Sequence, residues 1–235
     1  MAEPLARTRV YHLTAEEMTF TVTVTARASR VERWIRFVKK EFLDAAPIKC
    51  VGLDCEFTNP REGRQNQRAA VLQLSVAKEN LVFQIRWADE VPQLLKDFLR
   101  DNTIRFCGAA IHNDVRMLRY YKIDISTAVD LQQVIPNPTN NLIPSLYDLA
   151  NATIGTNLKK KKKMNKDDKK KNRKKNDEEE EEDELIFGWS NVPLSFEQVK
   201  YAALDARLGF EIARRHWMLH GYDTPFDRLN INVDE

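Results

Sequence analysis

Two carboxylates stand two residues apart in a stretch that is otherwise mostly apolar. Residues 51–57 read Val-Gly-Leu-Asp-Cys-Glu-Phe, which is typical of a short β-strand. Because side chains alternate faces along a strand, Asp54 and Glu56 point the same way and bring two negative charges together. A cation between them relieves that repulsion, and oxygen ligands favour Mg²⁺ or Mn²⁺. The alternative is a solvated pair on an edge strand.

This strand is the first of three at hairpin spacing. Polar residues with Pro60 and Gly63 follow it and predict a hairpin loop. Apolar strands are then expected over 69–77 and 81–85, around a turn at 78–80. The chain is therefore expected to form an antiparallel three-strand meander.

The segments around the meander alternate between the periods of a strand and of a helix. Alternating Thr and Val over 19–25 predict a half-buried strand that begins or edges the sheet. Ser29 is the expected N-cap of the next helix, and Ser195 with Gln198 forms a capping-box signature. Further elements are a strand over 104–110 and helices over 92–100, 112–121, 144–154 and 195–219. We expect an α/β fold with a mixed central sheet flanked by helices.

One globular domain over residues 1–235 is expected, because this length and 43% hydrophobic residues suffice for one sizeable core. Its N-terminal strand and helix occupy 18–43. The N-terminus lacks the apolar run of a signal peptide, and no segment approaches a membrane span. The three cysteines show no C-x-x-C spacing and suit a reducing compartment. We expect a protein of the nucleus or cytoplasm that is not secreted and has no membrane partner.

Residues 159–184 form a charged insert that interrupts this plan. It holds 12 Lys/Arg and 10 Asp/Glu of the chain's 37 and 35, which leaves 25 of each elsewhere. Because the rest of the chain has no net charge, any binding of nucleic acid by it must depend on a local group of basic residues. The basic part, 159–176, and the acidic part, 177–184, cannot build a core and are expected to be disordered. The insert is either a solvated loop or a working segment, with a nuclear-import signal or nucleic-acid tether in its basic part.

Further polar residues fall where they can join Asp54 and Glu56. Asp114 lies in the first turn of a helix that follows an apolar strand, a position that favours a carboxylate. Tyr201 and Asp205 are four residues apart on the last helix and therefore share one face. The rest of that face is small or apolar, so a buried Asp205 needs a partner.

In this order the motifs resemble those of the DnaQ-like exonuclease superfamily. The resemblance rests on Asp54-x-Glu56, on residues 108–118 (Gly-Ala-Ala-Ile-His-Asn-Asp-Val-Arg-Met-Leu) and on Tyr201-x-x-x-Asp205. It implies a ribonuclease-H-like fold and 3′→5′ exonuclease activity. Two divalent ions, Mg²⁺ or Mn²⁺, would be the cofactors, and nucleoside 5′-monophosphates the product.

The resemblance covers about residues 48–220 and is strongest to Werner-syndrome-type and ribonuclease-D-type exonucleases, through 189–191 (Trp-Ser-Asn) and 193–195 (Pro-Leu-Ser). Lys200 stands where the histidine subclass has its histidine, so the chain is similar to the tyrosine (DEDDy) subclass. The small size resembles the plant members, which include a homohexamer, and a hexamer is expected only by that analogy. The insert departs from the family pattern ahead of Trp189.

The resemblance also assigns roles to single residues. Asp54, Glu56 and Asp205 would hold the first ion with the attacking water. Asp54, and Asp114 through a water molecule, would hold the second. Tyr201 would orient the attacking water. Phe57 either stacks on the terminal base or belongs to the core.

The expected partner is single-stranded or 3′-recessed nucleic acid, and the residue types leave RNA and DNA open. Two rival interpretations remain. One is a catalytically silent nucleic-acid binder, although such a relative would be expected to lack one of the four carboxylates. The other is a protein-interaction scaffold that works through the charged insert.

Overall fold

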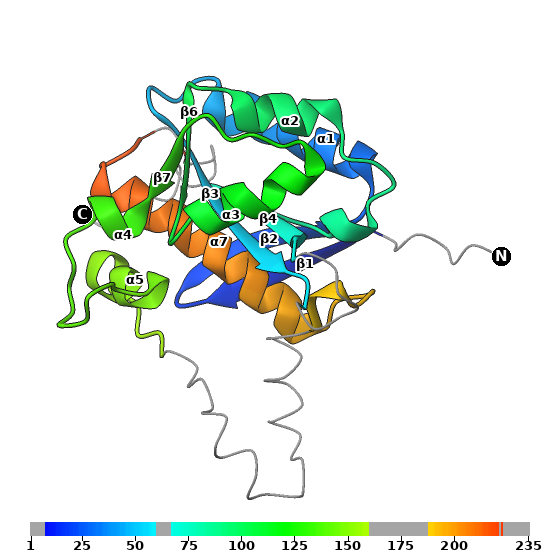
Figure 1. Ribbon diagram of the computed structural model, residues 1–235. Coiled ribbons are helices and arrows are strands. Elements are labelled where there is room, and N and C mark those ends of the chain that lie inside the picture. Colours follow the sequence, from blue (N-terminus) through cyan, green and yellow to red (C-terminus); the bar gives the residue numbers. More distant parts are fainter. Residues whose placement is uncertain (1–7, 60–66, 160–187, 221, 223–235) are drawn as a thin grey trace, which may run out of the picture.

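The computed structural model describes residues 8–59, 67–159, 188–220 and 222. Within these residues, seven strands form one sheet in the order β1-β2-β5-β4-β3-β6-β7, with helices on both faces (Figure 1). The strands are β1 (Arg9–Ala15), β2 (Met18–Thr25), β3 (Lys49–Phe57), β4 (Ala69–Val76), β5 (Glu79–Phe83), β6 (Ile104–Gly108) and β7 (Ala128–Asp130).

The centre of the sheet is the meander expected from the sequence. β4 pairs antiparallel with both β3 and β5. On one side of the meander β2 pairs parallel with β5, and on the other β6 pairs parallel with β3 and β7 with β6. The prediction of a mixed sheet with an antiparallel three-strand meander is therefore confirmed. Because β2, β3, β5, β6 and β7 all run in one direction, their carboxyl ends meet at one edge.

The outer edge of the sheet is formed by a strand, β1, that the sequence pattern did not predict. β1 pairs antiparallel with β2, so β2 is an interior strand and does not edge the sheet. The turn between them is formed by Glu16 and Glu17, whose φ angles are 49° and 63°. Two-residue hairpin turns with positive φ angles favour Asn and Gly, so a Glu-Glu pair does not indicate such a turn in the sequence.

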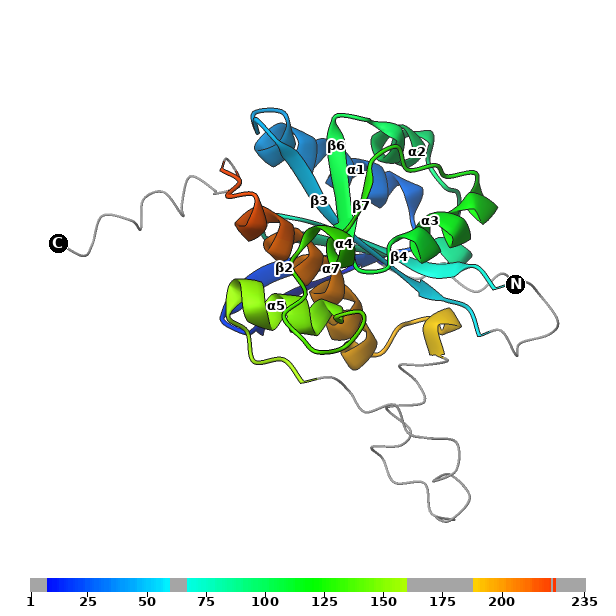
Figure 2. The same ribbon diagram turned by 60° about the vertical axis from the view of Figure 1, so that its left-hand side comes forward.

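The helices form two layers around the sheet (Figures 1 and 2). α7 (Phe196–His216) crosses one face, with α5 (Leu146–Ile154) packed against it. α1 (Ala28–Val38) and α2 (Gln93–Arg100) pack together over the opposite face. α3 (His112–Leu118) and the short α4 (Leu131–Val134) follow β6 and β7. β7 and α4 were not predicted from the sequence, because three or four residues are too few to show the hydrophobic periodicity of a strand or a helix.

The ends of two helices illustrate what capping patterns predict. The capping box of α7 is confirmed, because Ser195 Oγ accepts from the Gln198 N–H and Gln198 Oε1 from the Ser195 N–H. The predicted cap at Ser29 is wrong. α1 begins one residue earlier, and Asp89 Oδ1 accepts from the Ala28 N–H at 2.8 Å. That carboxylate comes from a segment 61 residues away, beyond the reach of a local pattern.

Two sequence predictions fall outside the described residues. These are the loop with Pro60 and Gly63 and all but Lys159 of the charged insert. The single-domain organisation also stays a prediction. In the described part of the chain, none of the helices has both the length and the apolarity that a bilayer crossing requires.

Candidate active site

The backbones of α7 and β3 touch directly at Gly52. A Cβ atom on Gly52 would lie 2.0 Å from the Ala206 carbonyl oxygen and 2.6 Å from the Phe210 nitrogen, so no side chain fits there. Because side chains alternate along a strand, Asp54 and Glu56 share the face of Gly52 and point toward α7. The glycine thus sets the distance between the carboxylates of the strand and those of the helix.

Asp205 of α7 joins the two carboxylates of β3. One ligand oxygen from each of Asp54, Glu56 and Asp205 lies within 4.8 Å of the others. Asp205 is 9% exposed, and the other two are half-buried. The buried Asp205 Oδ1 has no hydrogen-bond partner among the described residues. An orphaned oxygen in a group of hard anionic ligands fits a divalent cation such as Mg²⁺ or Mn²⁺.

The environment of these carboxylates opposes their ionisation. Burial raises the pKa of Asp54 to about 7. The pKa of Glu56 is raised well above its usual value by burial and then by the charges of Asp54 and Asp205. The pKa of Asp205 is likewise raised, by burial and then by Asp54. Three ionised carboxylates in one buried place are unfavourable without a cation, so the electrostatics agree with a metal site.

A fourth carboxylate lies beside this cluster. Asp114 is in the first turn of α3 and is 4% exposed. It is not among the three residues whose oxygens lie within 4.8 Å of one another. Burial, followed by the charge of Asp54, raises its pKa to about 9, while hydrogen bonds from its own backbone N–H and that of Cys55 oppose the shift. The structure thus brings all four predicted carboxylates to one region, with Asp114 beside Asp54.

Tyr201, one helical turn before Asp205, forms a hydrogen bond with it. Its pKa is raised, first by the charge of Asp205 and then by burial, so the phenol stays protonated and acts as a donor. The ring of Tyr201 packs against Trp189, which is 2% exposed, with their centroids 6.1 Å apart. Trp189 belongs to the 3₁₀ turn Gly188–Ser190 just ahead of α7. Its packing therefore helps to fix the position of the phenol.

A second phenol at the site was missed by the sequence analysis. Tyr147 of α5 also forms a side-chain hydrogen bond with Asp205, and burial followed by the charge of Asp205 raises its pKa. The capping box of Ser145 and Asp148 places it in the first turn of α5. The contact depends on how α5 packs on α7, and no spacing between residues 147 and 205 could have indicated it.

Phe57 ends β3 immediately after Glu56. The register with β4 shifts between these two residues, and Phe57 is half-buried against the main hydrophobic core. Part of its ring therefore packs against the core, and part is exposed to solvent. Both interpretations given by the sequence remain compatible with this position.

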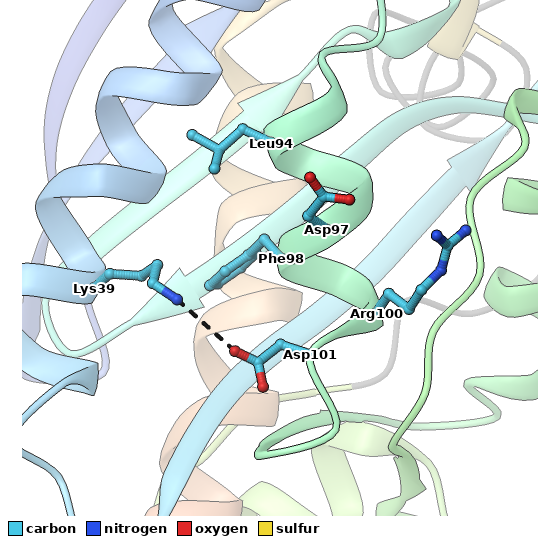
Figure 3. Close-up of a pocket in the computed structure, with 6 residues that line it drawn as sticks. All are labelled: Lys39, Leu94, Asp97, Phe98, Arg100 and Asp101. Atoms are coloured by element: carbon cyan, nitrogen blue, oxygen red, sulfur yellow. Dashed lines mark ion pairs between the residues drawn. The ribbon is translucent and has the colours of Figure 1, made fainter.

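A separate groove lies away from the carboxylates. Figure 3 shows this groove of about 390 Å³ between the end of α1 and α2, lined by six residues of which Lys39 and Asp101 form an ion pair at 3.8 Å. None of the four clustered carboxylates lines it. Its walls offer no group of metal ligands, so the candidate active site remains the carboxylate cluster.

The fold and the cluster together define an α/β protein of the ribonuclease-H-like class, with its acidic site at the carboxyl end of the central strands. The family model described as 3′-5′ exonuclease matches residues 26–217. This is most of the chain, and the chain therefore belongs to the 3′-5′ exonuclease family, whose members act on nucleic acid. The resemblance inferred from the motifs is confirmed.

Individual relatives agree with this assignment. The chain is 27% identical over 168 residues to the mouse (Mus musculus) bifunctional 3′-5′ exonuclease/ATP-dependent helicase WRN, covering 70% of this chain and 11% of that protein. The structure is similar to the catalytic core of RRP6 from Trypanosoma brucei (TM-score 0.60, 16% identity, 90% of this chain and 49% of that one). It is also similar to the Aedes aegypti Nibbler EXO domain (TM-score 0.55, 15% identity, 91% of each chain). These two structures support the predicted ribonuclease-H-like fold.

Proposed function

We propose that this protein is a metal-dependent 3′→5′ exonuclease of the tyrosine (DEDDy) subclass. Its substrate would be single-stranded or 3′-recessed nucleic acid, RNA or DNA, and its product nucleoside 5′-monophosphates. The observation that carries the proposal is the buried cluster of Asp54, Glu56 and Asp205 on the fold of an exonuclease family.

The site would hold two divalent ions. Asp54, Glu56 and Asp205 would hold the first; Asp54, and Asp114 through a water molecule, would hold the second. When bound, the ions would supply charge stabilisation at the scissile phosphate and its leaving oxygen. Four carboxylates carry the charge that two such ions balance, which agrees with the raised pKa values of Asp54 and Asp114 in their absence.

Tyr201 has the geometry of a water-orienting group. It is tied to Asp205 and held against Trp189, and its raised pKa keeps the hydroxyl protonated. Such a group aligns the attacking water by hydrogen bonding and does not remove its proton. Positioning of this kind contributes roughly 10²- to 10⁴-fold to a rate.

The test is digestion of 5′-labelled single-stranded RNA, single-stranded DNA and recessed duplex DNA, each with Mg²⁺, with Mn²⁺ and with chelator. We expect metal-dependent shortening from the 3′ end, and the preferred polymer identifies the substrate. Asp54→Asn should abolish shortening while its circular dichroism spectrum stays that of the parent. Turnover retained by the folded variant would sink the two-metal proposal, and no shortening by the parent would favour the silent or scaffold interpretation.

Two further expectations stay predictions. A nuclear or cytoplasmic location can be checked by imaging the tagged full chain. A homo-oligomer, six subunits by analogy, can be checked by sedimentation of the purified chain.

A further inference from the structure

A second charged site lies on α7, away from the carboxylate cluster. Arg207 is 6% exposed, and its Nη2 donates to Glu211 Oε1 at 2.7 Å. Glu211, itself 4% exposed, receives Arg214 on its other oxygen, at 2.8 Å from Nη2 and 3.0 Å from Nε. One buried carboxylate is therefore shared between two guanidinium groups. The group as a whole keeps an excess of positive charge.

The buried guanidinium of Arg207 is also incompletely satisfied. Its Nε and Nη1 have no hydrogen-bond partner within the part of the chain that the structure describes. Burial lowers the pKa of Arg207, and the opposing effect of Glu211 comes second. Among the described residues, Arg207 has Glu211 as its ion-pair partner and shares that carboxylate with Arg214, so a further anion nearby would be stabilising.

A pocket of about 300 Å³ opens at this group. The pocket lies between the second half of α7, the end of α5 and the β1–β2 hairpin. The charged side chains that line it are those of Glu17, Lys78, Arg207, Glu211, Arg214 and Arg215. Four of these side chains are cationic and two are carboxylates. The volume is at the lower end of the range for small-ligand sites, which suits a compact ion.

The neighbouring carboxylate of Glu16 is directed elsewhere. Its Oε2 accepts from the Asn157 backbone N–H at 2.8 Å, which ties the β1–β2 turn to the segment after α5. The wall of the pocket is therefore held in place, and Glu17 is the carboxylate that this turn contributes to the lining.

We propose that this pocket binds a phosphate-type oxyanion, taken either from free phosphate and mononucleotides or from the backbone of a nucleic-acid strand. Arg214 and Arg215 contact the anion at the mouth, because guanidinium groups match the oxygens of phosphate. Arg207 supplies fixed positive charge from the buried wall. Arg214 lies nine residues beyond Asp205 on the same helix, or roughly 13 Å along its axis, so the two sites are separate.

The test measures binding of inorganic phosphate by titration calorimetry and by thermal shift, in chelator and at constant ionic strength. Chelator leaves the clustered carboxylates without cations, and they then repel anions. We expect saturable binding by the parent and at least about a tenfold loss of affinity in the Arg214→Gln/Arg215→Gln double variant. Arg36→Gln is the matched control, because Arg36 is also in a helical ion pair, with Glu32, but far from the pocket.

A third variant is expected to bind phosphate more tightly than the parent, which a partly unfolded protein would not do. Glu17→Gln removes a carboxylate from the rim and should strengthen phosphate binding. Equal affinity in the parent, the double variant and the Glu17 variant would overturn the proposal, as would no binding by the parent. The source of the anion is identified by titrating two further ligands in the same way: adenosine 5′-monophosphate and an oligonucleotide without terminal phosphates. The source is the ligand whose binding is weakened in the Arg214→Gln/Arg215→Gln variant.

Discussion

At the scale of single residues, the site is a set of acids buried in a place that disfavours their charge. The pKa of Asp54 is raised to about 7 and that of Asp114 to about 9, with burial as the first cause for both. The same burial that weakens the metal-free protein prepares the site for cations, since a bound cation meets little competition from water. Both the stability of the fold and the readiness of the site to bind metal therefore depend on the protonation of these carboxyl groups.

Without divalent metal, stability should fall as pH rises. A carboxyl group whose folded pKa exceeds its unfolded value holds more protons in the folded state, so deprotonation costs folding free energy between the two values. For Asp54 and Asp114 that window runs from about 4 to about 9. We expect the Tm in chelator to drop by at least about 5 °C between pH 5.5 and 8.5.

The slope of Tm against pH should flatten in Asp114→Asn, measured by differential scanning calorimetry. Asp44→Asn is the control, because Asp44 is exposed and lies outside the cluster. A Tm that rises over this range in chelator, or a slope unchanged by Asp114→Asn, would contradict this coupling.

The two phenols that contact Asp205 should have separable roles. Tyr147→Phe removes a donor that orients a ligand carboxylate, so we expect the half-saturating Mg²⁺ concentration to rise roughly tenfold, with turnover largely restored by excess metal. Tyr201→Phe should lower turnover by about 10²-fold or more at any metal concentration. Initial rates measured over a Mg²⁺ titration distinguish the two effects.

Tyr121→Phe is the matched control for both variants. Its hydroxyl donates to the Ala69 carbonyl oxygen at 2.7 Å, so it loses a phenolic hydrogen bond that does not involve Asp205. Full activity of Tyr201→Phe would refute the role given to that phenol.

At the scale of elements, the site depends on the close approach of α7 to β3. Gly52 on the strand allows it, and Gly209 on the helix does the same against β6, where a Cβ would lie 2.9 Å from the Cys107 carbonyl oxygen. These contacts are between backbones, which cannot move aside as flexible side chains can. The position of Asp205 relative to Asp54 is therefore determined by two glycines, which have no functional side chain of their own.

Gly52→Ala should destabilise the protein by about 3 kcal/mol or more, because the methyl group overlaps the backbone of α7. Urea unfolding followed by circular dichroism measures this loss. Gly155→Ala is the control, because Gly155 has φ +81° but open space around it, so only about 1 to 2 kcal/mol of backbone strain is expected. If both variants lost the same free energy of unfolding, the close contact between α7 and β3 would not be what makes Gly52 necessary.

The elements that the sequence predicted well have strong internal patterns. β3, β4 and β5 show apolar runs between turn residues, and α7 begins at a capping box and continues for 21 residues without proline. The four carboxylates were found because residue type, spacing and order agreed. β1 and Tyr147 were missed because their positions follow from tertiary packing: an atypical turn for the strand, and the contact between α5 and α7 for the tyrosine.

At the scale of the whole molecule, the charge is divided between a formally neutral remainder and the charged insert. Outside 159–184, the chain carries 25 cationic and 25 anionic side chains. Attraction for nucleic acid outside the insert therefore depends on local groups, and the oxyanion pocket proposed on α7 would be one of them if its phosphate comes from a strand. The three clustered carboxylates and both phenols that contact Asp205 lie outside the insert.

Deletion of residues 159–184 should leave hydrolysis of a short oligonucleotide within about threefold of the parent, because surface loops are tolerated at many lengths. The scaffold interpretation expects the opposite, with loss of the protein's function on deletion. Replacement of the insert by a Gly/Ser segment of equal length controls for chain closure. Initial rates at low and high salt show whether the basic part adds an electrostatic tether.

The order of the chain also governs when this protein becomes capable of hydrolysis. Asp54 and Glu56 are synthesised about 150 residues before Asp205, a delay of roughly 8 to 30 s at ordinary elongation rates. Until α7 leaves the ribosome, the face of β3 around Gly52 has no helix to cover it. A nascent chain that has not yet reached α7 thus lacks the third clustered carboxylate of the site.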